Sequence, residues 1–341
     1  MQRREFLEAL FAAAAFAPHA FAVQSQETRR ILYVLGQFSQ ATPESMQAAV
    51  ETIGGSSFNV LILSFLQASQ AGGKLTLLYN GNPVSSLSPE VPALLARLRS
   101  GFGARKRVML SIGGWQNVST FAAIRSVGVV EFVRQLTDQV IHPLGFDGID
   151  IDLEPQTGGI DYWIGIHHDY GKLIVDLTNQ YKRVHPTHLV THSPLSFVAA
   201  EVYVKPTTIP GLTSGLLAAT RTNQRNNIDW LNVQLYEGGL VPGGDIAGYY
   251  RESLAAPLMQ IRKQTGIHSP LHFLTPLFEP QAHQPLAFCR QTIDAINQRC
   301  ATLHAGRISG VALWDYHHIA RSIGSWSAGL DATLHKESAH I

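Results

Sequence analysis

The sequence contains few of the residues that would tie it to a disulfide framework or a charged partner. It has 2 cysteines among 341 residues, and 15% of its residues are charged, with a formal net charge of +1. A nucleic-acid-binding surface usually carries a strong basic excess, so nucleic acid is not expected as a partner. Cys289 and Cys300 lie in one predicted helix, where eleven residues at the helical rise separate them by roughly 16 Å. They cannot bond to each other at that distance.

Long apolar runs are also missing after the N-terminal region, where no stretch approaches the roughly 20 apolar residues of a membrane span. At the N-terminus the pair Arg3-Arg4 precedes an apolar run, and a small-x-small cleavage pattern ends at Ala22. We expect residues 1–22 to be an export signal of the twin-arginine type, with a general secretory signal as the alternative. The sequence therefore predicts a bacterial protein that is periplasmic or secreted.

Apolar strands alternate with helical stretches from about residue 30 onward, which is typical of βα units. No long Pro, Ser or Gly linker interrupts the series, so residues 23–341 are predicted to form one domain. We expect eight strands: Ile31-Gly36, Asn59-Phe65, Arg107-Gly113, Gly145-Glu154, His188-Ser193, Ile228-Tyr236, Leu271-Leu277 and Ile308-Trp314.

The stretch from Gly145 to Pro155 carries three acids at a spacing of two residues. In a strand this spacing places Asp150, Asp152 and Glu154 on one face, and apolar residues on the other. So many acids in a desolvated place cannot all stay ionised, so at least one is expected to hold a proton near neutral pH. A held proton is what a general acid needs.

Two other interpretations of this acidic face are open. The face could be solvated and purely structural, although acids are rarely buried without purpose. Alternatively, the oxygen-rich cluster could hold a divalent metal such as Mg²⁺ or Ca²⁺.

The stretch from Asp147 to Glu154 resembles the DGxDxDxE motif of glycoside hydrolase family 18, the chitinases and endo-β-N-acetylglucosaminidases, with every motif position filled. The resemblance implies an α/β fold, a single-domain TIM (β/α)8 barrel with this motif on its fourth strand. It also implies retaining, substrate-assisted hydrolysis of β-1,4-linked N-acetylglucosamine.

Further motifs extend the resemblance to the third and sixth strands. Ser111, Gly113 and Gly114 match the family's SxGG motif, where paired glycines allow a ligand or another backbone to approach closely. A plain strand-to-loop turn is as compatible with that motif as direct contact with the substrate, and we expect Ser111, Gly113 and Gly114 to form a substrate-binding wall of the site. Gln234 and Tyr236 match the polar pair of strand six, which would place the Tyr236 phenol near the acetamido group of the substrate.

The last strand ends at Trp314, which matches the family's tryptophan under the cleaved sugar. The resemblance also implies cis peptide bonds at Ser64-Phe65 and Trp314-Asp315, which would place Phe65 at the floor of the site. The sequence departs from the family at Glu237, where Asp or Asn is usual. It departs again at His192-Ser193-Pro194, where the family has Met-Ala-Pro and where substrate preference is therefore open.

These residues predict an exported chitinase in which Glu154 is the general acid. By the resemblance, Asp152 orients the acetamido group, Asp150 tunes Asp152, and Asp147 supports the strand end beside the substrate site. No metal or organic cofactor is implied. The partners are chitin or N-acetylglucosamine oligosaccharides, bound by a monomer in a shallow, open cleft.

Two rival functions are compatible with the same sequence. An endo-β-N-acetylglucosaminidase acting on glycoprotein glycans would use the same acids. A non-catalytic chitin-binding barrel is the other rival, but it is disfavoured because Glu154 is present.

Overall fold

The computed structural model describes residues 28–35, 43–86, 106–156, 158–206, 209, 211–212, 214–222, 225–236, 244–280 and 284–335. The expected export signal and Glu237 lie outside the described residues.

Eight parallel strands close into a barrel, because β1 pairs with both β12 and β2. The order around the barrel is β1-β12-β11-β10-β7-β6-β5-β2. The predicted TIM barrel is therefore confirmed, and the motif strand β6 is the fourth barrel strand in sequence. The barrel strands are β1 (Arg29–Leu35), β2 (Val60–Ala71), β5 (Arg107–Gly114), β6 (Gly148–Leu153), β7 (Leu189–His192), β10 (Trp230–Gln234), β11 (Leu274–Phe278) and β12 (Gly310–Leu313).

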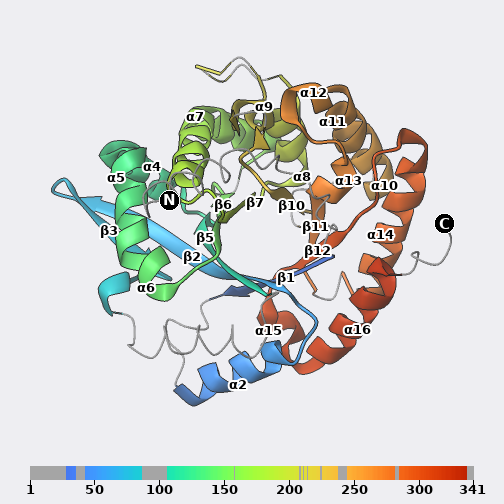
Figure 1. Cartoon of the computed structure of the whole chain (residues 1–341), viewed down its shortest axis with the longest axis horizontal. Helices are drawn as coiled ribbons and strands as arrows, with labels where there is room; N and C mark the ends of the chain where they lie inside the picture. Colours follow the sequence, from blue (N-terminus) through green and yellow to red (C-terminus); the bar gives the residue numbers. More distant parts are fainter. Residues whose placement is uncertain are drawn as a thin grey trace, which may run out of the picture.

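Helices surround the barrel on its outside (Figure 1). Their apolar sides cover the outward faces of the strands, which are buried along nearly their whole length, as expected for a parallel sheet. The longer helices are α2 (Pro43–Gly54), α4 (Val118–Val127), α5 (Val129–Leu136), α7 (Ile160–Val184), α14 (Leu286–Cys300) and α16 (Ile323–Leu334). Among the described residues, no helix is both long and apolar enough to cross a membrane.

Short helical segments complete the ring. They are η1 (Val84–Ser86), η2 (Thr137–Ile141), α6 (His142–Leu144), α8 (Ser196–Val198), η3 (Ala199–Val204), α9 (Leu216–Ala219), α10 (Ile246–Tyr249), η5 (Tyr250–Ala255), α11 (Ala256–Gln260), α12 (Arg262–Thr265), α13 (Pro270–Phe273), η6 (Ala301–Leu303), α15 (Tyr316–Ile319) and η7 (Ala320–Ser322).

A hairpin that the sequence analysis did not predict extends the second strand. Strand β2 runs on to Ala71 and pairs antiparallel with β3 (Lys74–Tyr79), which pairs in turn with the two-residue β4 (Asn82–Pro83). The hairpin projects from the side of the barrel (Figure 1). Its sequence signal is the alternation of Leu75, Leu77 and Tyr79, all buried.

The seventh strand begins later than predicted. Pro270 opens the short helix α13, so β11 starts only at Leu274. Proline suits the first turn of a helix because its missing N–H needs no partner there.

On the following helix, α14, Cys289 and Cys300 are both buried and free. Strand β8 (Arg221–Thr222) and strand β9 (Arg225–Asn226) form a separate small hairpin.

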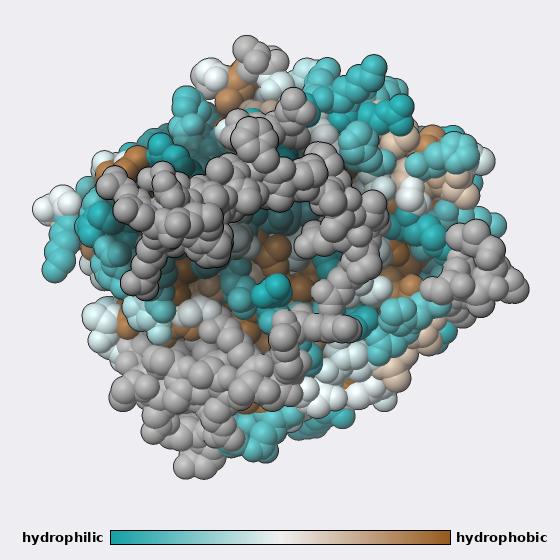
Figure 2. Space-filling view, viewed as in Figure 1, coloured by the Kyte–Doolittle hydropathy of each residue, from teal (hydrophilic) through white to brown (hydrophobic). Residues whose placement is uncertain are grey.

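The face viewed in Figure 1 has a mixed surface at its centre. Figure 2 shows hydrophobic residues beside hydrophilic ones in the middle of this face.

The contact between β5 and β6 depends on a missing side chain at Gly113. Its φ is +113°, and a Cβ atom there would lie 2.1 Å from the carbonyl oxygen of Asp152. We therefore expect Gly113→Ala to lower the free energy of unfolding by about 3 kcal/mol or more, since both the backbone and the strand spacing must change. Urea denaturation measures this loss.

Gly72→Ala is the matched control, because Gly72 also has a positive φ, +56°, but has no atom within 4 Å of the added Cβ. We expect it to cost about 1 kcal/mol. Equal losses in the two variants would show that the close approach of β6 contributes nothing.

Candidate functional site

The three acids predicted to form the centre of the site lie in a row of decreasing burial. Asp150 and Asp152 on β6 are 0% and 2% exposed, and Glu154 follows the strand end and is partly exposed. The alternating residues Ile149, Ile151 and Leu153 face the other way and are buried. The predicted alternation is confirmed, so the acidic row points into the barrel and ends at its carboxyl-terminal rim.

Asp150 is surrounded by hydrogen-bond donors from four other strands. Its carboxylate accepts from Thr191 Oγ1 at 2.6 Å, Ser111 Oγ at 2.9 Å, Ser193 Oγ at 2.9 Å, the Tyr33 hydroxyl at 3.2 Å and Asn232 Nδ2 at 3.3 Å. Burial raises the pKa of Asp150, and the hydroxyl donors offset part of that shift. The donors fix this carboxyl group in one orientation behind Asp152.

Asp152 and Glu154 form a hydrogen-bonded pair. Burial raises the pKa of Asp152 well above its usual range, and the charges of Glu154 and Asp150 and the hydrogen bond to Glu154 act in the same direction. The ionised form of Asp152 is therefore disfavoured beside Glu154. Because Glu154 is the partly exposed member, the pair can present an acid at the rim of the barrel.

Gln234 is the last residue of β10, and its side chain points toward the acids of β6. Its Nε2 atom is 2.7 Å from the Ser193 carbonyl oxygen, 3.1 Å from Glu154 Oε1 and 3.2 Å from Asp152 Oδ1. The structure thus brings Gln234 to the acids, as predicted. It is 1% exposed, however, so it acts on the acids and leaves little surface for a ligand.

Tyr236 lies just beyond the end of β10 and is partly buried. Its phenol raises the pKa of the Tyr33 hydroxyl, which places it near the residues that hold Asp150. The predicted residue Tyr236 is therefore on the same side of the barrel as the acids, and its partial exposure leaves it open to a ligand.

Aromatic rings form the opposite side of the site. Trp314 stacks on Phe65, with ring centroids 5.4 Å apart and an interplanar angle of 28°, and it also contacts the Tyr33 ring at 5.6 Å. Trp314 is partly exposed, whereas Phe65 is 7% exposed. The cis peptide bonds expected at Ser64-Phe65 and Trp314-Asp315 are both present.

The SxGG residues support the site from behind. Ser111 is fully buried and donates to Asp150, so the expectation that it contacts substrate is corrected. Gly113 and Gly114 pair with Asp152 and Leu153 of β6. A Cβ atom on Gly114 would lie 2.5 Å from the Phe65 ring, so this glycine makes room for an aromatic side chain of the protein.

Asp147 is not brought together with the other acids. It precedes β6, at the opposite end of the strand, and its carboxylate accepts from the Val108 backbone N–H at 2.8 Å and lies 3.8 Å from Arg107. Its expected place beside the substrate is therefore wrong, because the strand itself separates it from Glu154. Its role in fixing a strand end, which the motif also implied, is what the structure shows.

Four residues of the Asp150 environment were missed by the sequence analysis. Tyr33, Thr191 and Asn232 lie on barrel strands and Ser193 directly follows β7, and all four point inward to Asp150. The alternation that identified the acids was also available here. Thr191 and Ser193 are two residues apart, as are Asn232 and Gln234.

A divalent metal on the acidic face, the other interpretation of the sequence, would need several ligand side chains close together. Within the described ranges, no group of three or more His, Cys, Asp or Glu side chains is placed to hold a metal ion.

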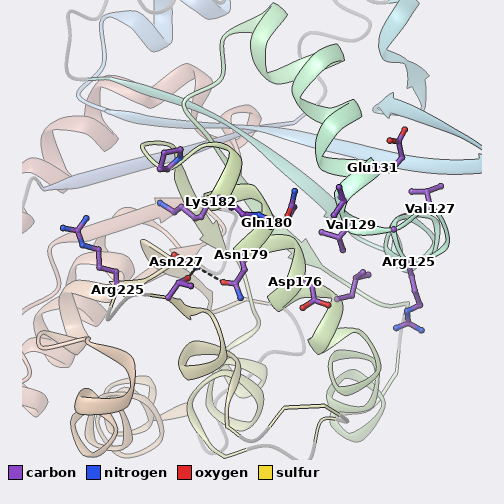
Figure 3. Close-up of a pocket in the computed structure, with 16 residues that line it drawn as sticks. Arg125, Val127, Val129, Glu131, Asp176, Asn179, Gln180, Lys182, Arg225 and Asn227 are labelled. Carbon is purple, nitrogen blue, oxygen red and sulfur yellow. Dashed lines mark hydrogen bonds between the residues drawn. The ribbon is translucent and has the colours of Figure 1, made fainter. Parts of the chain in front are cut away.

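A wide pocket also lies on the outer surface, away from the acids (Figure 3). Residues of α4, α5 and the second half of α7 line it, together with the β8–β9 hairpin. Asn179 and Asn227 are hydrogen-bonded across part of it. None of the three acids of β6 lines this pocket, so it is separate from the candidate active site.

Comparison with known proteins identifies relatives of this architecture. The family model described as Glycosyl hydrolases family 18 matches residues 30–303. No curated relative matches the sequence.

Solved structures share the fold at low sequence identity. A putative chitinase A from Streptomyces coelicolor is 16% identical with a TM-score of 0.62, over 92% of this chain and 100% of that one. A family 18 chitinase from Pseudoalteromonas aurantia is 16% identical with a TM-score of 0.60, over 90% and 100%. A fungal endo-β-N-acetylglucosaminidase is 19% identical with a TM-score of 0.59, over 91% and 99%.

The raised pKa of Asp152 has a consequence for stability. As pH rises above about 4, the unfolded chain releases this proton while the folded protein keeps it, so the free energy of unfolding falls. Asp152→Asn removes the group that titrates. We expect this variant to be more stable than the wild type by at least about 1 kcal/mol at pH 7, and equally stable near pH 4. Urea denaturation across this pH range measures the difference.

Asp294→Asn, on the exposed surface of α14, controls for the loss of one negative charge. Both variants are compared with the wild type at the same pH values. If Asp152→Asn were less stable than the wild type at pH 7, its carboxyl group would not be the proton-retaining one.

Proposed function

The chain belongs to the glycosyl hydrolases of family 18, and from this premise we propose that it hydrolyses β-1,4-linked N-acetylglucosamine in chitin and chitooligosaccharides. The reaction proposed is internal cleavage with retention of the anomeric configuration. The observation that carries the proposal is the acidic row that runs along β6 and ends in a partly exposed Glu154, which is hydrogen-bonded to buried Asp152.

In the proposed first step, Glu154 donates its proton to the glycosidic oxygen as the bond to the anomeric carbon breaks. The acetamido oxygen of the same sugar attacks that carbon and forms an oxazolinium ion. In the second step water attacks the anomeric carbon and opens the ring of this ion, and Glu154 takes the proton of the water. No second carboxylate is needed beneath the sugar.

The neighbouring residues support this reaction by their positions. Asp152, hydrogen-bonded to Glu154, is placed to orient the acetamido group and to stabilise its positive charge. Asp150 holds a fixed negative charge or dipole behind Asp152, because its donors fix its orientation. Tyr236, which lies partly buried just beyond the end of β10, is the proposed donor to the acetamido oxygen.

The aromatic side of the site supports a sugar as the ligand. The partly exposed Trp314 offers a flat apolar surface, which suits the apolar face of a pyranose ring. Strand β11 ends at Phe278 and α14 begins at Leu286, so the connection between them is short. It is too short for an inserted domain that would deepen the cleft, which supports an open cleft and internal cleavage.

An endo-β-N-acetylglucosaminidase acting on glycoprotein glycans is the second candidate within the same family. The placement of the acids is compatible with this second substrate as well as with chitin. Incubation with chitotetraose and with a high-mannose glycoprotein separates the two candidates. Cleavage of the glycoprotein alone would replace the chitinase proposal with this one.

Glu154→Gln keeps the shape of the general acid and removes its proton. We expect kcat on chitotetraose to fall by 10²-fold to 10⁴-fold, with KM changed little, because the proton is needed in the transition state. Proton NMR of the first products of the wild type is expected to show the β anomer.

Glu201→Gln is the matched control, because Glu201 lies on the outer helix η3 in an exposed ion pair with Lys205. It is expected to retain wild-type kcat. A Glu154→Gln variant as active as this control would refute the assignment of the acid.

A further inference from the structure

Asn80 lies in the turn that joins β3 to β4, in the hairpin beside the barrel. It follows β3 and has φ +46°, and the next residue, Gly81, has φ +79°. Two successive positive φ angles fit a type I′ turn, for which Asn-Gly is a favoured pair. The turn alone would explain an asparagine here, and it would do so without any use for the side chain.

The side chain of Asn80 nevertheless reaches back to the end of β2. Its Oδ1 accepts from the Phe65 backbone N–H at 3.2 Å, and its Nδ2 donates to the Ser64 carbonyl oxygen at 2.9 Å. The Asn80 backbone N–H also donates to the Phe65 carbonyl oxygen at 3.1 Å. One residue of the hairpin thus satisfies three polar backbone groups of Ser64 and Phe65, which have no neighbour in the regular β2–β5 ladder at this point.

The ring of Phe65 connects Asn80 to the site. It fills the space that a Cβ atom on Gly114 would occupy, and it stacks on Trp314. Trp314 contacts the Tyr33 ring, and the Tyr33 hydroxyl donates to Asp150. Trp314 therefore lies between a ring fixed by Asn80 and a ring fixed by the acidic row.

We propose that Asn80 is a positioning residue that sets the plane of the Trp314 indole through Phe65. The role of that plane under a sugar rests on the proposed function. Asn80 itself does not touch the reacting atoms. The hairpin is on this account part of the active-site scaffold, because its turn determines where Phe65 lies.

The test combines Asn80→Gly with Trp314→Phe in a double-mutant cycle. Glycine keeps the turn, since Gly-Gly also suits a type I′ turn, and removes both side-chain hydrogen bonds. We expect Asn80→Gly to lower kcat/KM on chitotetraose by about tenfold, because small displacements of a substrate-positioning group are costly. In the Trp314→Phe background the same change is expected to cost less than about twofold.

Near-UV circular dichroism provides a readout that does not depend on activity. Asn80→Gly is expected to change the tryptophan bands of the wild type and to leave those of Trp314→Phe unchanged. If the wild type cleaves no substrate, the proposed function fails, and the spectra still decide the role of Asn80.

Asn82→Ala is the matched control in the same turn, because its side chain donates to the Asn80 carbonyl oxygen and does not reach β2. It is expected to keep kcat/KM within about twofold of the wild type. If Asn80→Gly does not fold, Asn80→Asp replaces it, since Asp-Gly also forms this turn but lacks the donor to Ser64. Equal losses with and without Trp314, or no spectral change, would overturn the proposal.

Discussion

The site depends on three carboxyl groups in one row, two of them buried, where the cost of desolvation opposes the charged forms. Asp150 lies deepest and is held by hydroxyl and amide donors, whereas Asp152 has Gln234 and Glu154 as its hydrogen-bond partners. The free-energy cost of a second buried charge therefore falls on Asp152, whose pKa is raised well above its usual range. This arrangement favours a protonated acid in the pair that Asp152 forms with Glu154.

A closed parallel barrel is what makes such an environment possible. The donors to Asp150 come from β1, β5, β7 and β10, which are far apart in sequence but converge on the interior. Because alternate residues of each strand point inward, these strands can bring their side chains together around Asp150. The close packing of β5 on β6 requires Gly113, so the motif on the third strand serves the acids of the fourth.

Much of this could be predicted from the sequence, because period-two alternation is local. The strands and the acidic row were found in this way, whereas Gln234, Tyr236 and Trp314 were found through the resemblance to the family. The donors around Asp150 were missed because they belong together only after barrel closure. The β2–β3 hairpin was missed because its alternation follows a strand without a break. Asp147 was misplaced because it was assigned to the site with the rest of the motif, although it precedes the strand and Glu154 follows it.

The amide nitrogen of Gln234 has two hydrogens but three oxygen atoms within reach, on Ser193, Asp152 and Glu154. The Ser193 carbonyl oxygen is the closest of the three at 2.7 Å, which leaves one hydrogen for two carboxyl groups. Whichever carboxyl group is ionised can attract that hydrogen more strongly. A single neutral side chain can thus follow the movement of a proton between two acids by a small rotation, without a charged residue entering the barrel.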